Sequence, residues 1–129
     1  MSELSPPRVA VVEDDPETVA FLQHLFTEMG LHLIACPPSI APACIVADRP
    51  DLIILEVRLG TLDGIDLFQQ LRAHAGTCTL PVIFFTANAA KVRSRLPRYQ
   101  EQGAALVSKP NITQLIAALQ ETLPQPAAG

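Results

Sequence analysis

A small set of polar side chains lies at the ends of apolar runs, at four separate places along the chain. They are Glu13 with Asp14, then Glu56, Thr86 and Lys109. If the apolar runs are parallel strands of one sheet, these side chains meet at its carboxyl edge, where open α/β sheets bind ligands. Converging carboxylates repel one another unless a cation lies between them, and oxygen ligands with room for water suit Mg²⁺. A hydroxyl and an ammonium beside such a metal could bind a phosphoryl group by donating hydrogen bonds and neutralising charge.

The same side chains also have structural explanations. Asp15, which follows the acidic pair, suits the N-cap of a helix that Pro16 begins, so we interpret it as a cap. Lys109 could be a solvated surface lysine, but Pro110 disfavours helical backbone at the preceding residue and favours a fixed, extended Lys109. Thr86 alone is uninformative, because threonine is common at strand ends.

The elements that must position these side chains alternate between strand and helix patterns. The predicted strands cover residues 9–12, 31–35, 52–55, 81–85 and 104–107. Their continuous apolar runs are typical of strands covered on both faces. Helical patterns lie between them, including one that ends at Gly30 and one that Asn111 caps. Parallel strands joined by right-handed helical crossovers form a three-layer α/β sandwich.

Two helical segments are less regular. The second predicted helix has Ser39 as its N-cap and Pro42 in its first turn. Its expected inward residues are Ile40, Cys44 and Ala47. The segment 87–102 has poor apolar periodicity and contains Pro97, which predicts a short or broken fourth helix.

Length and composition limit the possible classes of protein. The chain has 129 residues, 49% of them hydrophobic, which fits one domain with a core over about residues 8–123 and excludes disorder for most of the length. Residues 1–7 and 124–129 each carry prolines and are predicted to be loose termini. The longest apolar runs are far shorter than a membrane span of about 20 residues, and the N-terminus has no signal-peptide pattern.

Charge and cysteine content limit the partners and the compartment that the protein can have. Nine Lys and Arg against thirteen Asp and Glu give a net charge of −4, which argues against nucleic acid as a direct partner. Cys36, Cys44 and Cys78 lack metal-ligand spacing, so we interpret them as small apolar residues of a protein in the reducing cytoplasm. A redox or metal role is the alternative.

Four motifs carry a family resemblance. They are VAVVEDDP at 9–16, RPDLIILEVRLGTLDGIDLFQQLR at 49–72, LPVIFFTA at 80–87 and GAALVSKP at 103–110. With these motifs in this order, the chain resembles a response-regulator receiver domain of two-component signalling over essentially residues 8–123. The resemblance implies a flavodoxin-like (βα)5 fold with a parallel five-stranded sheet of order 2-1-3-4-5.

The resemblance also implies a set of site residues. Glu13 and Asp14 would be the acidic pair that helps bind Mg²⁺, with Asp14 the more direct ligand. The backbone carbonyl of Arg58 would be another metal ligand. Thr86 and Lys109 would contact the phosphoryl group.

Glu56 departs from the family pattern, because the phosphoacceptor of receivers is an aspartate at this position. The neighbouring aspartates, Asp51, Asp63 and Asp66, do not lie at that strand end. The extra methylene moves the carboxylate forward by roughly 1.3–1.5 Å, and misplacement by about 1 Å can cost on the order of 100-fold in rate. Glu56 could still ligate Mg²⁺, pair with Lys109 and leave the site empty, or partly imitate a phosphorylated aspartate, which carries more charge.

Leu106 is a second departure, since many receivers have an aromatic switch residue there. Leucine cannot report phosphorylation by the same rotamer change, although it also serves simply as a packing residue. The basic residues of the irregular segment are Lys91, Arg93, Arg95 and Arg98. They predict either a solvated segment or a charged partner surface, and the face of helix 4, strand 5 and helix 5 is where receivers commonly dimerise.

The interpretation that follows is a degenerate receiver that acts as a protein-interaction module, with a histidine kinase or another two-component protein as partner. The first alternative is a phosphorylation-competent receiver that takes phosphate from a histidine kinase. The second is a small Mg²⁺-dependent phosphate-handling enzyme, which lacks a placed catalytic His, Cys or Ser and a Gly-rich phosphate loop. We therefore expect no enzymatic activity and no membrane association. Mg²⁺ is the candidate cofactor.

Overall fold

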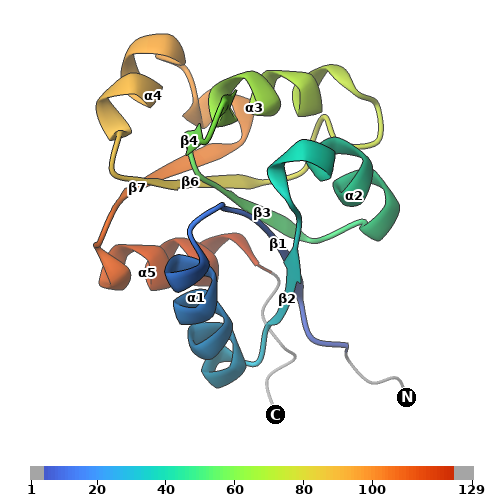
Figure 1. Ribbon diagram of the computed structural model, residues 1–129, viewed down its shortest axis with the longest axis vertical. Helices are drawn as coiled ribbons and strands as arrows, with labels where there is room; N and C mark the ends of the chain where they lie inside the picture. The colour runs from blue at the N-terminus through green and yellow to red at the C-terminus, as the bar shows by residue number, and fades with distance from the viewer. Residues whose placement is uncertain (1–4, 124–129) are drawn as a thin grey trace.

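The central element is a parallel five-stranded sheet (Figure 1). The protein is seen in a computed structural model that describes residues 5–123. The strands are β1 (Arg8–Val12), β2 (His32–Ala35), β3 (Leu52–Leu55), β6 (Val82–Thr86) and β7 (Ala104–Ser108). Their order is β2-β1-β3-β6-β7. This is the 2-1-3-4-5 order that the family resemblance implies, once a small hairpin between β3 and β6 is set aside.

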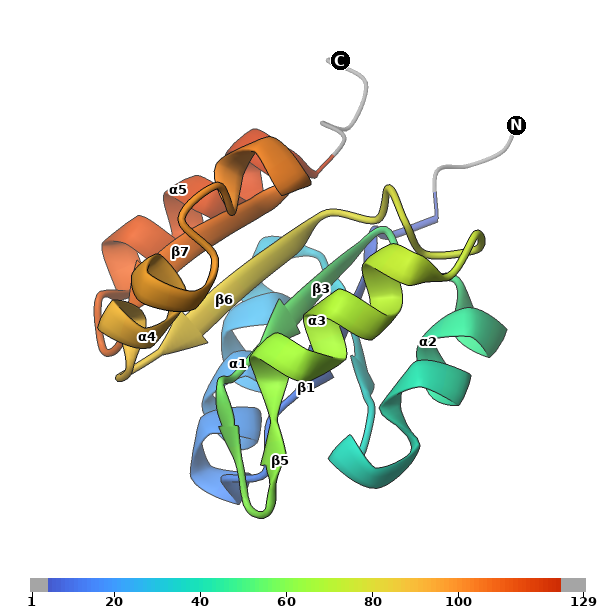
Figure 2. The ribbon, with the colours of Figure 1, turned by 90° about the horizontal axis from the view of Figure 1, so that it is seen from above.

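Five helices cover the two faces of this sheet. They are α1 (Pro16–Met29), α2 (Ala41–Asp48), α3 (Gly64–Ala73), α4 (Ala89–Arg95) and α5 (Ile112–Thr122). Helices α1 and α5 lie on one face, whereas α2, α3 and α4 lie on the other (Figures 1 and 2). Short 3₁₀ turns at Pro38–Ile40 and Gln100–Gln102 complete the crossovers. The architecture is the predicted three-layer sandwich, and none of its described helices is long and apolar enough to cross a bilayer.

The strands explain why the apolar runs in the sequence are continuous. Along β3, Leu52 and Ile54 face the cluster beneath α1 and α5, while Ile53 and Leu55 face the cluster beneath α2, α3 and α4. All four side chains are buried, because successive strand residues point to opposite faces and both faces are covered. The core therefore consists of two apolar layers that the sheet separates.

Most helix ends follow the sequence signals. The Asp15 carboxylate accepts a hydrogen bond from the Glu17 N–H, and Gly30 ends α1 with a φ of 74°. Asn111 Oδ1 accepts from the Gln114 N–H at 3.0 Å and caps α5. The predicted break in segment 87–102 is also present, as the short helix α4 followed by a separate 3₁₀ turn.

The expectation for the second helix was wrong. Ser39 does not cap it, because residues 38–40 form a 3₁₀ turn and α2 begins only at Ala41. The buried residues of α2 are Ala41 and Ile45, whereas Ile40 is 55% exposed and Ala47 also faces solvent. The 3₁₀ turn rotates the chain before the helix starts, so the apolar stripe begins one residue later than predicted.

Two further features were not anticipated. A two-stranded antiparallel hairpin, β4 (Arg58–Leu59) and β5 (Leu62–Asp63), connects β3 to α3. The interpretation of the cysteines as buried residues holds for Cys36, but Cys44 is half-buried and Cys78 is exposed. All three are free thiols.

Candidate functional site

Three side chains from distant parts of the sequence meet at the carboxyl edge of the sheet. The ammonium of Lys109 contacts Glu56 Oε1 at 2.7 Å and Glu13 Oε1 at 2.8 Å. Glu13 follows β1, Glu56 follows β3 and Lys109 follows β7. The parallel topology brings these strand ends together, as the sequence predicts. We call Glu13, Glu56 and Lys109 the charged triad.

Lys109 is held in place from its own strand. Its backbone N–H donates to the Thr86 carbonyl oxygen at 2.9 Å, which extends the pairing of β6 and β7 by one residue. The Lys109–Pro110 peptide bond is cis. The ammonium also lies 5.6 Å from the centre of the Phe85 ring, within the range of a cation–π contact. The lysine is therefore part of the wall of the site.

Glu56 is buried, and both of its carboxylate oxygens have partners. Oε1 accepts from Lys109, while Oε2 accepts from the Val57 N–H at 2.5 Å and from the Arg58 N–H at 3.4 Å. Gly64 fixes the backbone beside it, because the Gly64 N–H donates to the Val57 carbonyl at 2.7 Å. A Cβ at Gly64 would lie 2.0 Å from the Glu56 carbonyl oxygen, so only glycine fits there.

Glu13 is the most buried carboxylate of the triad, with 4% of its side chain exposed. Its Oε2 accepts from the Asp15 N–H at 3.1 Å. Burial raises the pKa of Glu13, although the hydrogen bond from Lys109 works in the other direction. Burial also disfavours the charged form of Lys109, but the hydrogen bonds to Glu13 and Glu56 outweigh it and raise the Lys109 pKa.

The predicted metal ligands do not all converge. Glu13 and Glu56 both bind Lys109. Asp14 is exposed, and its Oδ2 lies 3.9 Å from the position that a Cβ would occupy at Gly60. Arg58, whose backbone carbonyl is the predicted ligand, lies in the hairpin strand β4. Within residues 5–123, no group of three or more His, Cys, Asp or Glu side chains is arranged to hold a metal ion. The donor atoms have the right chemistry for Mg²⁺, but their arrangement here surrounds an ammonium instead.

The remaining predicted site residues line the neighbouring strands. Thr86 is fully buried at the end of β6, and its hydroxyl accepts a hydrogen bond from the Asn88 N–H at 2.9 Å. Leu106 lies in β7, paired with Phe84, and packs against the apolar layer beneath α2, α3 and α4. Thr86 thus orders the start of α4, and Leu106 acts as a packing residue in this structure.

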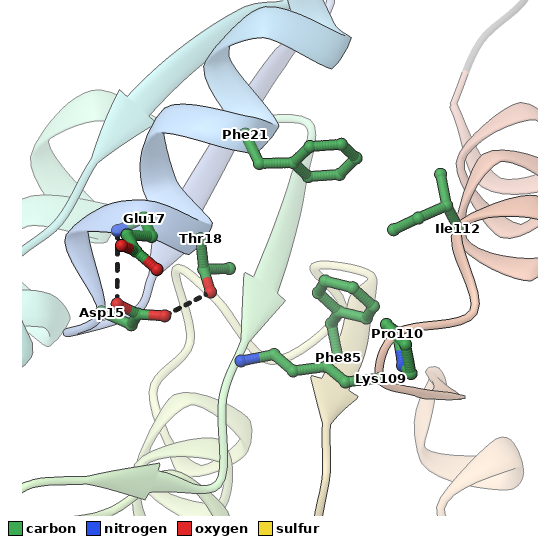
Figure 3. A pocket seen from close by; sticks show the side chains of 8 residues that line it. All are labelled: Asp15, Glu17, Thr18, Phe21, Phe85, Lys109, Pro110 and Ile112. Carbon is green, nitrogen blue, oxygen red and sulfur yellow. Dashed lines mark hydrogen bonds between the residues drawn. The ribbon is translucent and has the colours of Figure 1, made fainter.

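A cavity of about 330 Å³ lies beside Lys109 (Figure 3). Phe21, Phe85 and Ile112 line its apolar part, and Asp15 and Lys109 lie at its polar end. Sequence reasoning missed this cavity. The signal in the sequence was Phe21, a large apolar residue outside the buried stripe of Leu22 and Phe26 on α1. In the structure, Phe21 is 41% exposed.

The basic segment around α4 is largely paired within the molecule. Lys91 Nζ contacts Asp63 Oδ2 at 2.6 Å, and Arg95 contacts both Asp63 at 3.6 Å and Asp66 at 3.2 Å. Burial opposes ionisation of Asp63, but hydrogen bonds from Lys91 and the Ile65 N–H outweigh it and lower the Asp63 pKa. These contacts join α4 to the start of α3. The sequence alone allows either a solvated segment or a charged partner surface. In the structure, Lys91 and Arg95 are bound to carboxylates of the same molecule.

A comparison with family models identifies the family of the chain. Residues 9–120 match the model of the response regulator receiver domain, so the chain belongs to that family of two-component signalling modules. The flavodoxin-like fold agrees with this assignment.

Curated relatives are similar over nearly the whole chain. The DNA-binding dual master transcriptional regulator RpaA of Synechocystis is 26% identical over 120 residues, which cover 91% of this chain and 49% of that protein. The response regulator MprA of Mycolicibacterium vanbaalenii is 28% identical over 130 residues, covering 96% of this chain and 55% of that protein. The chain thus spans about half the length of these relatives.

Solved structures share the fold. The chemotaxis response regulator CheY4 of Vibrio cholerae has a TM-score of 0.78 and 21% identity, with 92% of this chain and 99% of that chain covered. The receiver domain of the sensor histidine kinase PA1611 from Pseudomonas aeruginosa has a TM-score of 0.77 and 24% identity, with 91% and 97% covered. The PA1611 structure is described with a magnesium ion coordinated in its active site cleft.

Proposed function

We propose that this chain is a degenerate receiver that signals through contacts with other proteins and does not accept a phosphoryl group at a useful rate. The observation that carries the proposal is the position of Glu56, whose two carboxylate oxygens are bound to the Lys109 ammonium and to the backbone N–H groups of Val57 and Arg58. A phosphoacceptor needs a free carboxylate oxygen in line with the phosphoryl group. Glu56 has 10% of its side chain exposed and lacks that freedom.

Lys109 supports the same conclusion. In a phosphorylated receiver this ammonium would neutralise the phosphoryl oxygens, but here it already binds two carboxylates. A phosphoryl group would have to displace at least one of them. The contact between Glu56 and Lys109 resembles the contact of a phosphorylated aspartate only in part, because the glutamate carries one charge and a phosphoryl group nearly two.

The proposed partners are proteins of two-component signalling, such as a histidine kinase. RpaA is named as DNA-binding, but this chain spans 49% of its length, and we propose that the domain seen here does not bind nucleic acid itself. Its net charge of −4 supports that view. A homodimer through α4, β7 and α5 remains a prediction.

Mg²⁺ has a limited place in this proposal. Glu13, Asp14 and Glu56, with the carbonyl of Arg58, are the residues that would hold it. Two of these carboxylates would first have to leave Lys109. The ion would supply charge neutralisation between carboxylates, which Lys109 already provides.

Intact-mass spectrometry tests the proposal. The wild-type chain and the variants Glu56→Asp and Glu56→Gln are incubated with a small phosphodonor in the presence of Mg²⁺. We expect Glu56→Asp to gain one phosphoryl group, because the shorter side chain withdraws from Lys109 and leaves room for it. Wild type and Glu56→Gln, the matched control without a carboxylate, should gain none.

Phosphorylation of the wild-type chain at Glu56 would establish the alternative, a competent receiver. Phosphorylation of wild type and Glu56→Gln to the same extent would place the modification on another residue and would also contradict the proposal, because the chain would then accept a phosphoryl group. If no variant is modified, the remaining site residues, and not Glu56 alone, prevent the reaction.

A further inference from the structure

Two of the three free thiols contact each other where the chain leaves β2 and enters α2. Cys36 is buried directly after β2, and Cys44 is half-buried inside α2. Cys36 belongs to the apolar layer beneath α2, α3 and α4, and Cys44 packs against that layer. The Cys36 thiol is hydrogen-bonded to the Cys44 thiol, so the two sulfur atoms are neighbours. We propose that Cys36 and Cys44 form a reversible disulfide, which makes the pair a site of oxidative modification.

Regular backbone structure holds both cysteines. The Cys36 N–H donates to the Val11 carbonyl oxygen at 3.0 Å, which extends the pairing of β2 with β1 by one residue. Cys44 lies inside α2, and its S–H donates to Asp48 Oδ2, one turn later in the helix, at 3.5 Å. A disulfide has about 2.05 Å between its sulfur atoms, so the two side chains must still rotate toward each other. The fold thus brings the thiols together before any oxidant arrives.

The reaction needs an oxidant, for which we name a low-molecular-weight disulfide such as oxidised glutathione. Cys44 is the more accessible thiol, so its thiolate attacks one sulfur of the reagent, whose S–S bond breaks and releases one thiol. The Cys36 thiolate then attacks the Cys44 sulfur, the bond between the two cysteines forms, and the second thiol leaves. Two protein thiols are oxidised, one disulfide is reduced to two thiols, and the protons of Cys36 and Cys44 pass to the released thiols.

Burial slows this reaction without deciding its equilibrium. Burial, together with the hydrogen bond to Cys44, raises the pKa of Cys36, so little of its thiolate is present at neutral pH. The second step is therefore slow. The equilibrium depends instead on how closely the fold holds the two thiols, because that sets their effective concentration. We expect the pair to respond to sustained oxidation and not to brief exposure.

This inference goes beyond the proposed function. It uses no residue of the charged triad, and it is tested without a phosphodonor. Cys78 serves as an internal comparison, because it is exposed and lies between α3 and β6.

The experiment equilibrates the wild-type chain for hours in glutathione buffers of graded oxidation, once native and once unfolded in urea. Acid then stops the exchange, and the remaining thiols are alkylated. Cys36 and Cys44 are the only cysteines of tryptic peptide 9–58, because trypsin does not cleave between Arg49 and Pro50, whereas Cys78 lies in peptide 73–91. The disulfide appears as peptide 9–58 without alkyl groups and lighter by two hydrogen atoms than the dithiol form.

We expect the ratio of disulfide to dithiol to be at least about tenfold higher in the native chain than in urea at the same glutathione ratio. Cys78→Ser is the matched control and should behave as wild type does. Cys36→Ser and Cys44→Ser should give only mixed disulfides with glutathione. The oxidised wild-type chain should also melt roughly 4 °C or more above the reduced chain, because a disulfide that the fold accommodates stabilises it.

Two results would overturn the proposal. One is a native ratio no higher than the ratio in urea, since the fold would then not position the two thiols. The other is an oxidised chain that melts below the reduced chain, which would mean that the bond distorts the junction of β2 and α2. Both comparisons use the wild-type chain, so they decide the proposal even if a serine variant does not fold.

Discussion

Glu56 shows how one methylene changes the chemistry available to a site. A carboxylate at this strand end reaches Lys109 directly and folds its second oxygen back onto the following backbone. Its partners in this structure are the Lys109 ammonium and the backbone N–H groups of Val57 and Arg58. The sequence predicts the types of these residues and their meeting at one edge. It does not predict that Asp14 would stay outside while Glu13 turns inward, because neighbouring carboxylates differ only in the direction that the local backbone gives them.

Removing Lys109 tests the energetics of the charged triad. Lys109→Ala leaves two buried carboxylates without a cation, and we expect it to lower the free energy of unfolding by roughly 2–3 kcal/mol at neutral pH. Urea denaturation measures this change. Lys91→Ala, whose pair with Asp63 is more exposed, should cost less than about 1 kcal/mol. An equal cost for the two variants would contradict the role assigned to burial.

The effect of Lys109→Ala should depend on pH in a defined direction. Glu13 has a folded-state pKa above its ordinary value of 4.5, so the folded state holds a proton there more tightly than the unfolded chain does. The contribution of this group to stability therefore rises as the pH falls from neutral through the raised pKa. Without Lys109 the pKa of Glu13 should rise further, because the hydrogen bond that lowers it is lost. The free-energy cost of the substitution should therefore shrink between pH 7 and pH 4.5. A cost that increases on acidification would contradict this account.

At the scale of elements, Gly64 joins β3, the hairpin and α3. Its missing side chain allows α3 to begin against the backbone of Glu56. Because a Cβ would lie 2.0 Å from the Glu56 carbonyl oxygen, we expect Gly64→Ala to cost roughly 3 kcal/mol or more. Gly60→Ala is the control, since that residue has a φ of 66° in an exposed turn, and it should cost about 1 kcal/mol. Chemical denaturation of both variants measures the difference, and a similar cost would exclude the close approach as the cause.

Asp63 has two roles at the junction of α3 and α4. One oxygen caps α3 by accepting from the Ile65 N–H at 2.7 Å, and the other binds Lys91. Asp63→Asn keeps a capping side chain but loses the charge, so we expect a cost of about 0.5–1 kcal/mol at pH 7. Asp63→Ala loses the cap as well and should cost about 1 kcal/mol more.

The pH dependence of Asp63→Asn follows from the lowered pKa of Asp63. This stabilisation is fully present above the ordinary value of 3.8 and is lost as the pH falls through the lower folded-state pKa. The difference in unfolding free energy between wild type and Asp63→Asn should accordingly vanish at acidic pH. A difference that stays constant down to pH 3 would assign the effect to packing and not to charge.

At the scale of the whole molecule, the sequence predicts the sheet well and the α2 region poorly, for a physical reason. Strands covered on both faces must be apolar throughout, and that signal survives without knowledge of neighbouring elements. The start of α2 depends on how Pro37 and Pro38 turn the chain, and the resulting 3₁₀ turn shifts the buried stripe. The hairpin β4–β5 is too short for any pattern to reveal.

The cysteines differ in how deeply they are buried. Cys36 is buried, and burial raises the pKa of its thiol, whereas Cys78 is exposed. We expect a maleimide reagent to label Cys78 rapidly in the native protein and Cys36 only when the protein unfolds. Mass spectrometry of the labelled peptides measures both rates, with Cys78→Ser as the control. Fast native labelling of Cys36 would show that the layer beneath α2 and α3 opens locally.

Strand β3 has one further consequence. Its interior, Leu52–Leu55, offers nearly the same apolar surface to both layers, so hydrophobicity alone does not distinguish the present alignment from one displaced by a residue. Its alignment is fixed at its two ends, where the Asp51 carboxylate accepts from the Arg8 N–H at 2.8 Å and Glu56 is bound to Lys109. The Asp51 carboxylate at one end and the Glu56 contact with Lys109 at the other therefore fix the register of the strand. The interior can accept exchange among Leu, Ile and Val that the ends cannot.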